Sequence, residues 1–299
     1  MTSTFICYEP KKFSTDRLAM IKKINSVVDK FEADGYVLTV RQIYYQFVKN
    51  DWVPNIPQSY NLLQGLINDG RLAGLISWTA IEDRERGLKG WDTFTAPAQA
   101  LEQLKENYKL DLWQGQSFRP EVWVAKKALE GVIGRICGEL RVDFFACKGY
   151  NSQSEQWRAG RRFADYIRRG QRPIVFHLGD HDPSGIDMTR DNRERLSMFA
   201  GSPIIVQRIA LNMPQIEELD PPPNPAKVTD SRSDSYIAQY GESSWELDAL
   251  DPKYISDLIR DALMQIREED KWDAMLTQEV NDKLLFDEMI EVSGGTVKE

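Results

Sequence analysis

Residues 174–185 read IVFHLGDHDPSG. The stretch opens with residue types typical of a buried strand, and Asp180 and Asp182 follow directly after it. Pro183 and Ser184 then suit the first turn of a helix, whose N-terminus favours phosphate. Ligands of open α/β sheets lie beyond the carboxyl ends of the strands, and paired carboxylates suit Mg²⁺. The stretch therefore predicts a strand, a metal-binding acidic turn and a helix; the alternative is a solvated acidic turn that only caps the helix.

Strands and helices alternate on both sides of this stretch. The runs with strand character are Glu121–Val124, Val142–Ala146, Ile174–Leu178 and Ile204–Ile209. The segments with helical periodicity are Lys126–Leu140, Ser154–Arg169 and Gly185–Phe199. This order predicts a parallel α/β domain over residues 116–299, in which two acidic helices follow the sheet.

The first part of the chain has a different pattern. Helical periodicity covers residues 14–34, a helix begins at Thr39 and a third covers residues 59–68. The spacing of Thr39 and Gln42 is that of a capping box. Short apolar pieces and glycines over residues 70–90 then suggest a hairpin. Three helices and a hairpin predict a winged-helix DNA-binding domain over residues 1–115.

The helix that begins at Thr39 carries two neighbouring tyrosines. Its apolar stripe consists of Val40, Ile43, Tyr44, Phe47 and Val48. Tyr45 is off this stripe and shares the opposite face with Arg41 and Lys49, so we expect it to be exposed beside basic groups. A phenol has a pKa near 10 and needs activation to act as a nucleophile, which Arg41 could provide. An ordinary surface tyrosine is the alternative.

Charge is distributed unevenly along the 299 residues. The net charge is −8, but the segment from Glu242 to Glu299 has 16 acidic and 6 basic residues, so that it carries −10 and the first 241 residues carry +2. Seven basic and three acidic residues lie between Arg141 and Gln171. A polyanionic partner is thus compatible with the acidic total, although a basic run is also typical of a solvated helix face.

Several features point to a cytoplasmic protein that does not enter membranes. No apolar run approaches the roughly 18 residues that span a bilayer, and Met1 to Lys12 lacks a signal-peptide pattern. The three cysteines show no disulfide-like or zinc-like spacing, which suits a reducing compartment.

The acidic turn and the paired tyrosines together resemble one family. Residues 180–187, Asp-His-Asp-Pro-Ser-Gly-Ile-Asp, are similar to the second signature of Toprim domains, in the version of the topoisomerase VI A subunit and its meiotic double-strand-break relative. Residues 41–45, Arg-Gln-Ile-Tyr-Tyr, resemble that family's Arg-x-x-Tyr-Tyr motif. The resemblance implies a winged-helix domain before a Toprim domain, Mg²⁺ bound by Asp180 and Asp182, and Tyr45 as the catalytic tyrosine that forms a 5′-phosphotyrosyl link to DNA.

The same resemblance implies a homodimer, in which metal and tyrosine meet across the interface. The sequence does not show whether an ATPase subunit of the GHKL type is a partner. We further expect Lys49, Arg71, Arg84, Arg86 and Lys148 to contact DNA.

One position departs from the family pattern. Toprim domains have a glutamate at the end of their first strand, whereas Ala125 follows Glu121–Val124 here. Glu121 lies roughly 13 Å back along an extended strand and does not easily substitute. We hypothesise that Ala125 is an engineered replacement that inactivates the metal site; natural degeneration is the alternative. Residues 246–250 resemble a later acidic motif of the family, but we assign them no metal.

Three functions follow from these patterns. The first is Mg²⁺-dependent DNA cleavage by Tyr45, with the chain as given inactivated at Ala125. The second is a Toprim nuclease that uses a metal-activated water. The third is a non-catalytic DNA-binding protein with a degenerate Toprim domain.

Overall fold

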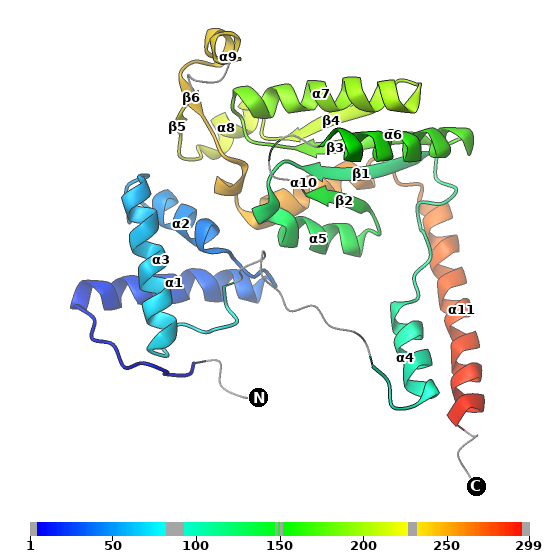
Figure 1. Ribbon diagram of the computed structural model, residues 1–299, viewed down its shortest axis with the longest axis horizontal. Helices are drawn as coiled ribbons and strands as arrows, with labels where there is room; N and C mark the ends of the chain where they lie inside the picture. The colour runs from blue at the N-terminus through cyan, green and yellow to red at the C-terminus, as the bar shows by residue number, and fades with distance from the viewer. Residues whose placement is uncertain (1–4, 82–92, 147–148, 150–151, 227–231, 295–299) are drawn as a thin grey trace.

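A four-stranded parallel sheet lies at the centre of the second half of the chain (Figure 1). The computed structural model describes residues 5–81, 93–146, 149, 152–226 and 232–294. The strands pair in the order β2-β1-β3-β4. They are β1 (Phe118–Val124), β2 (Asp143–Ala146), β3 (Arg172–Leu178) and β4 (Ile205–Ala210). The prediction of a parallel α/β sheet is confirmed, and each expected strand lies within two or three residues of its predicted bounds.

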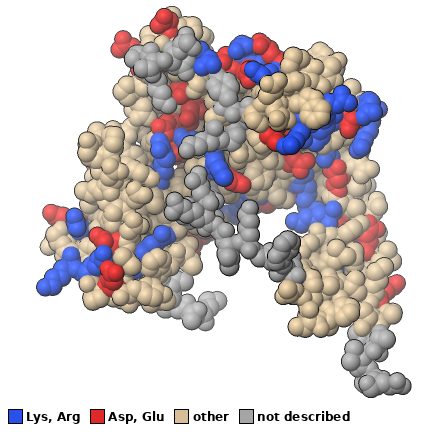
Figure 2. Space-filling model, in the orientation of Figure 1, with Lys and Arg blue, Asp and Glu red and all other residues tan. Residues whose placement is uncertain are grey.

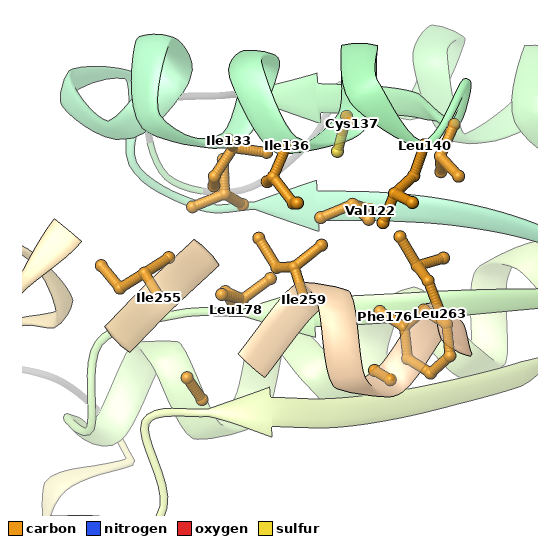
Figure 3. Packing of buried hydrophobic residues seen from close by; sticks show 14 of the residues in the cluster. Val122, Ile133, Ile136, Cys137, Leu140, Phe176, Leu178, Ile255, Ile259 and Leu263 are labelled. Carbon is orange, nitrogen blue, oxygen red and sulfur yellow. The ribbon is translucent and has the colours of Figure 1, made fainter. Parts of the chain in front are cut away.

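Helices cover both faces of this sheet (Figure 1). One face carries α6 (Gln153–Arg168) and α7 (Pro183–Ala200), and the other carries α5 (Glu130–Glu139) and α10 (Pro252–Met264). Because side chains alternate along a strand, Val122 packs toward α5 and α10 while Trp123 packs toward α6 and α7. Figure 3 shows Val122, Phe176 and Leu178 of the sheet packed against apolar side chains of α5 and α10.

Three helices form the N-terminal part: α1 (Thr15–Ala33), α2 (Val40–Lys49) and α3 (Pro57–Leu72). The capping box of Thr39 and Gln42 is present, as predicted. The hairpin expected over residues 70–90 falls partly on residues 82–92, which are outside the described residues. The described residues up to Ile81 make single bridges instead, from Ala73 to Cys7 and from Ile81 to Leu38.

A helix that the sequence did not predict, α4 (Pro97–Asn107), lies beside α11 (Glu269–Gly294) and away from the sheet (Figure 1). Lys105 pairs with Asp287, and the Tyr108 hydroxyl donates to Asp282 at 2.7 Å. Trp272, at the start of α11, packs edge to face on Trp113 in the core below the sheet. The expected boundary at residue 115 stays a prediction.

The remaining elements connect β4 to α10. They are α8 (Met213–Leu219), β5 (Asn224–Pro225), α9 (Ser233–Tyr240), β6 (Ser243–Ser244) and the 3-10 turn η2 (Leu247–Ala249). A second 3-10 turn, η1 (Lys127–Leu129), follows β1.

None of the helices in the described part of the chain combines the length and apolar character needed to cross a bilayer.

Candidate functional site

The acidic turn lies at the carboxyl end of the sheet, as the sequence predicts. Asp180 follows β3 and Ala125 follows β1, and the Ala125 N–H donates to the Leu178 carbonyl at 3.0 Å, so the two strand ends are direct neighbours. Ala125 is partly buried at this edge. The next residue, Lys126, has extended backbone angles before the chain turns into η1.

A second acidic segment, residues 245–249, lies against the same edge. His181 and Trp245 exchange backbone hydrogen bonds of 2.8 and 2.9 Å. The Leu247 N–H then donates to Asp180 Oδ1 at 2.8 Å. This antiparallel contact places Glu246 and Asp248 beside Asp180, although more than 60 residues of sequence separate them.

Lys126 binds these acidic groups together. Its Nζ lies 2.6 Å from Asp248 Oδ1, 2.7 Å from Glu246 Oε2 and 3.5 Å from Asp180 Oδ1. An ammonium has three N–H donors, and three carboxylates surround this one. The side chain of Asp248 is fully buried and that of Lys126 is 16 % exposed, so these charges are largely removed from water.

Arg41, on the N-terminal helix α2, also contacts this group of charged side chains. Its Nη2 lies 2.5 Å from Glu246 Oε2, and its Nε lies 3.1 Å from Asp248 Oδ2. The same Nη2 is 3.4 Å from the Tyr45 hydroxyl. We call the whole group the Lys126 cluster; its members are Arg41, Tyr45, Lys126, Asp180, Glu246 and Asp248.

Burial and pairing set the charge states of the cluster. Burial raises the pKa of Asp248 and of Asp180 despite the nearby ammonium of Lys126. Burial acts in the same direction on Glu246, but Lys126 and Arg41 outweigh it and hold the pKa of Glu246 low. Burial alone would lower the pKa of Lys126, but the carboxylates overcome it and keep the amine charged. Burial thus favours the neutral forms of Asp180 and Asp248, whereas Glu246, Lys126 and Arg41 are charged.

Tyr45 is buried, which corrects the expectation of an exposed tyrosine on a basic face. Its exposed fraction is 3 %, and Ala249 lies in the same apolar cluster. The helical phase of α2 places Tyr45 opposite the stripe of Tyr44, but residues 246–249 cover that second face. Burial, followed by the charges of Asp248 and Glu246, raises the pKa of Tyr45 well above its ordinary value. The phenol is therefore neutral and shielded in this arrangement.

Asp182 serves the helix that follows it. Its Oδ1 accepts hydrogen bonds from the Gly185 N–H at 2.6 Å and from the Ser184 hydroxyl at 3.2 Å, and α7 begins at Pro183. This is the capping role that the sequence left as an alternative. Asp182 is not among the partners of Lys126.

Arg208 of β4, which the sequence did not single out, holds the acidic turn of residues 179–185 in place through hydrogen bonds to its backbone. Its guanidinium donates to the carbonyls of Gly179 at 2.8 Å, Asp180 at 2.7 Å and Gly185 at 2.8 Å. Burial lowers the pKa of Arg208 to about 10, so the group stays positive at neutral pH. Because one guanidinium satisfies three carbonyls of this turn, the position of Asp180 depends on β4 as well as on β3.

As arranged, these side chains do not fit a bound magnesium ion. Mg²⁺ requires near-octahedral oxygen ligands at about 2.0–2.1 Å. Asp182 is committed to the helix cap, Lys126 and Arg41 already neutralise Glu246 and Asp248, and position 125 offers no oxygen. Among the residues that the structure describes, no three acidic, histidine or cysteine side chains are grouped for a metal.

Glu121 does not reach this site, in agreement with the distance argument. It lies on the α6 side of β1, where Arg162 donates to its two oxygens at 2.7 and 3.0 Å and the Trp123 indole donates at 2.9 Å. This ion pair, in which Glu121 is buried and Arg162 is partly exposed, joins α6 to the sheet.

Of the five residues expected to contact DNA, the structure describes Lys49 and Arg71. Lys49 is exposed at the end of α2. Arg71 donates to the carbonyls of Trp78 and Ile81 and so holds the segment after α3. Arg84, Arg86 and Lys148 lie outside the described residues. On the face seen in Figure 2, Lys and Arg side chains gather at the upper right, where α6 ends.

Both histidines of the chain are buried at the edges of this region. His177 hydrogen bonds to the Thr189 hydroxyl at 2.8 Å, and His181 hydrogen bonds to the Tyr236 hydroxyl at 2.7 Å. Burial, with the charge of Arg208, lowers the pKa of His177 to about 3 and that of His181 to about 4.

The low pKa of each histidine makes stability depend on pH. Below about pH 6.5 the histidine is protonated in the unfolded protein but stays neutral in the folded protein. The free energy of unfolding therefore falls as the pH falls from 6.5 toward 4. We expect each histidine to contribute a loss of about 1.4 kcal/mol per pH unit in this window. Urea unfolding of wild type and of His177→Asn at several pH values measures this loss. The difference between the two proteins removes the contributions of the other titrating groups, which both share. Identical slopes for the two proteins would contradict the assignment.

Comparisons with models of protein families, with curated proteins and with solved structures found no match. The fold and the site themselves define an α/β protein with a parallel sheet and a buried charged cluster at the carboxyl ends of two strands.

Proposed function

We propose that this protein is a topoisomerase VI A-like transesterase of DNA phosphodiesters, with Tyr45 as the nucleophile, and that alanine at position 125 leaves the chain as given inactive. The observation that carries the proposal is the contact between the two motifs. Arg41 and Tyr45 on α2 and Asp180 after β3 belong to one cluster, bridged by Glu246 and Lys126. This contact is made within one chain, so the expected homodimer stays a prediction.

The arrangement of elements also supports the proposal. Three N-terminal helices with a capped second helix are compatible with a winged-helix domain, and an acidic turn after a parallel strand is compatible with a Toprim domain. Neither name follows from the fold alone, since many functions share such folds.

The chemistry that we propose is a single exchange at phosphorus. The Tyr45 oxygen attacks the phosphorus, a bond forms between them, and the bond to the 3′ oxygen breaks to leave a 5′-phosphotyrosyl link. The phenolic proton passes to a carboxylate of the Lys126 cluster, and the leaving oxygen takes a proton from water. Arg41 would hold the phosphate once Glu246 releases it. Tyr45 is buried, so the cluster must open before DNA reaches the phenol.

A non-catalytic DNA-binding protein is the second candidate. The specific observation in its favour is that both cations of the cluster are paired with carboxylates while Tyr45 is shielded, with alanine at position 125. A protein that has lost its cleavage chemistry would retain such a closed site without penalty.

The decisive experiment restores the missing carboxylate. We expect Ala125→Glu, incubated with supercoiled plasmid and Mg²⁺, to give nicked or linear DNA and a protein–DNA adduct that resists denaturation. Adding Tyr45→Phe should remove the adduct and the cleavage. Adding Tyr44→Phe is the matched control and should preserve both, because the Tyr44 hydroxyl bonds to Asn55 and not to the cluster.

Other outcomes separate the candidates. Cleavage that survives Tyr45→Phe and leaves no adduct would replace the tyrosine mechanism by attack of water. DNA binding without cleavage in every variant and every divalent metal would favour the second candidate. Salt sensitivity of binding alone decides nothing, since any phosphate contact produces it.

A further inference from the structure

We infer that a pocket at the amino ends of β1 and β3 is a binding site for a phosphate group, carried by a nucleotide or by a DNA strand. The pocket has a volume of about 490 Å³, within the range of small-molecule sites. Because β1 is seven residues long, about 20 Å of strand separates the pocket from the Lys126 cluster at the carboxyl ends. The inference therefore concerns a second site and does not rest on the proposed function.

Two turns of the chain form much of the wall of this pocket. Residues 114–117 lead into β1, and residues 169–171 connect α6 to β3. The Gln171 side-chain amide donates to the carbonyls of Trp113 at 2.8 Å and Gln116 at 3.0 Å, so that it ties the two turns together. The wall is thus held in place before a ligand binds, which lowers the entropic cost of binding.

Arg119 brings a cation with unused donors into the pocket. Its side chain is 12 % exposed, and only its Nη1 donates hydrogen bonds to the described residues, to both oxygens of Asp111 at 2.6 and 2.5 Å. Its Nη2 lies 3.9 Å from Asp143 Oδ2, which is beyond hydrogen-bond distance. A guanidinium has five N–H donors. Nε and Nη2 of Arg119 therefore retain donors for an anion in the pocket.

Tyr166 adds a hydroxyl group that has no partner. The residue is 9 % exposed and lines the pocket, and the guanidinium carbon of Arg119 lies 4.9 Å from the centre of its ring. Within the described part of the chain, the Tyr166 hydroxyl makes no hydrogen bond. Burial raises the pKa of Tyr166, so the hydroxyl keeps its proton and can donate it. A polar group buried without a partner is costly, and a ligand oxygen would supply the missing acceptor.

The charges around the pocket favour an anion. The lining side chains include three cations and one acid, namely Arg119, Arg169, Lys271 and Asp111. Lys271 is paired with Glu268 at 2.7 Å, whereas Arg169 makes no ion pair with any residue that the structure describes. Figure 2 shows further Lys and Arg side chains gathered where α6 ends. A phosphate group offers several strong acceptor oxygens to guanidinium and hydroxyl donors, and the pocket volume also admits an attached sugar.

The carboxyl end of α6 borders the same pocket. Free carbonyls at such an end carry partial negative charge and would repel an anion. Here the carbonyls of Asp165, Tyr166 and Ile167 accept the N–H groups of residues 169–171. The exposed guanidinium of Arg169 offsets the remaining negative potential.

The test removes single donors and measures binding of two probes. The probes are deoxyadenosine monophosphate, followed by calorimetric titration, and a short fluorescent DNA duplex, followed by anisotropy at fixed salt. We expect Tyr166→Phe to weaken the probe that uses the pocket by about tenfold, with an unchanged melting temperature because the lost hydroxyl has no partner. Arg169→Gln should also weaken that probe. Arg168→Gln is the matched control, because Arg168 carries the same charge but pairs with Asp165 and does not line the pocket.

The two probes distinguish the source of the phosphate. Weaker binding of the monophosphate identifies a nucleotide site, and weaker binding of the duplex alone identifies a contact with the DNA backbone. Equal affinity of wild type and Tyr166→Phe for both probes would overturn the inference, as would a wild type that binds neither. If Tyr166→Phe lowers the melting temperature, the comparison of Arg169→Gln with Arg168→Gln decides, and equal affinities then count against the pocket. None of these results bears on the cleavage experiment, which is read at Tyr45.

Discussion

Replacing Arg162 by methionine is expected to lower the free energy of unfolding by about 3 kcal/mol. Glu121 is 2 % exposed, and two of its three hydrogen bonds come from Arg162. Without the guanidinium, a carboxylate stays buried with only the Trp123 indole as a donor. We take the low end of the range for such pairs because Arg162 itself is partly exposed. Urea unfolding measures the change.

Two further variants distinguish the ion pair from general damage to α6. Arg161→Met, on the exposed neighbour, should change the free energy of unfolding by less than about 0.5 kcal/mol. Adding Glu121→Gln to Arg162→Met should recover part of the loss, because it removes the unpaired charge. A loss below about 1 kcal/mol for Arg162→Met, with no recovery on adding Glu121→Gln, would show that the pair contributes little.

Replacing Gly185 by alanine is expected to cost about 3 kcal/mol or more of unfolding free energy. A Cβ at this position would lie 2.1 Å from the Asp180 carbonyl oxygen and 3.0 Å from Asp182 Oδ1. The obstacle is backbone, and Arg208 binds the same carbonyl, so the turn cannot yield cheaply. Chemical denaturation gives the stability.

Gly138→Ala is the matched control for Gly185→Ala. Gly138 is also helical, but a Cβ there would meet no atom within 4 Å. Alanine has the higher helix propensity, so this variant should be up to about 1 kcal/mol more stable than wild type. A Gly185→Ala protein as stable as Gly138→Ala would contradict the close packing of α7 on the acidic turn.

The sheet could be predicted from the sequence because its signals are local. Each strand is a short apolar run such as Ile174–Leu178, and the intervening helices have their own periodicity. The caps at Thr39 and Asp182 are local in the same sense, since each spans only three residues of sequence. Elements whose stability depends on distant partners were harder to predict; α4, for example, has no buried residue of its own.

The site could be predicted from the sequence only in part, because most of its contacts join residues that are far apart in the chain. The periodicity of α2 shows which residues share a face, but it cannot show that residues 246–249 return to cover Tyr45. Asp180 can be predicted because its motif is continuous in sequence. Lys126 cannot, because a single lysine after a strand has no distinctive pattern and its partners follow more than 50 residues later. Glu246 and Asp248 form a recognisable acidic pattern, but only the contact with Lys126 gives that pattern a role.

The pairing of α4 with α11 has a consequence for how the chain is made. The residues that lead into β1 are held by late ones: the Leu110 N–H donates to Glu279, and Trp113 packs on Trp272. A ribosome delivers the chain from its N-terminus at about 5–20 residues per second. Residues 97–113 therefore emerge several seconds or more before their partners and stay without them until α11 has been synthesised. Final assembly is thus a late event. If a ribosome stalls before α11 is made, residues 97–113, which lead into β1, stay without their packing partners.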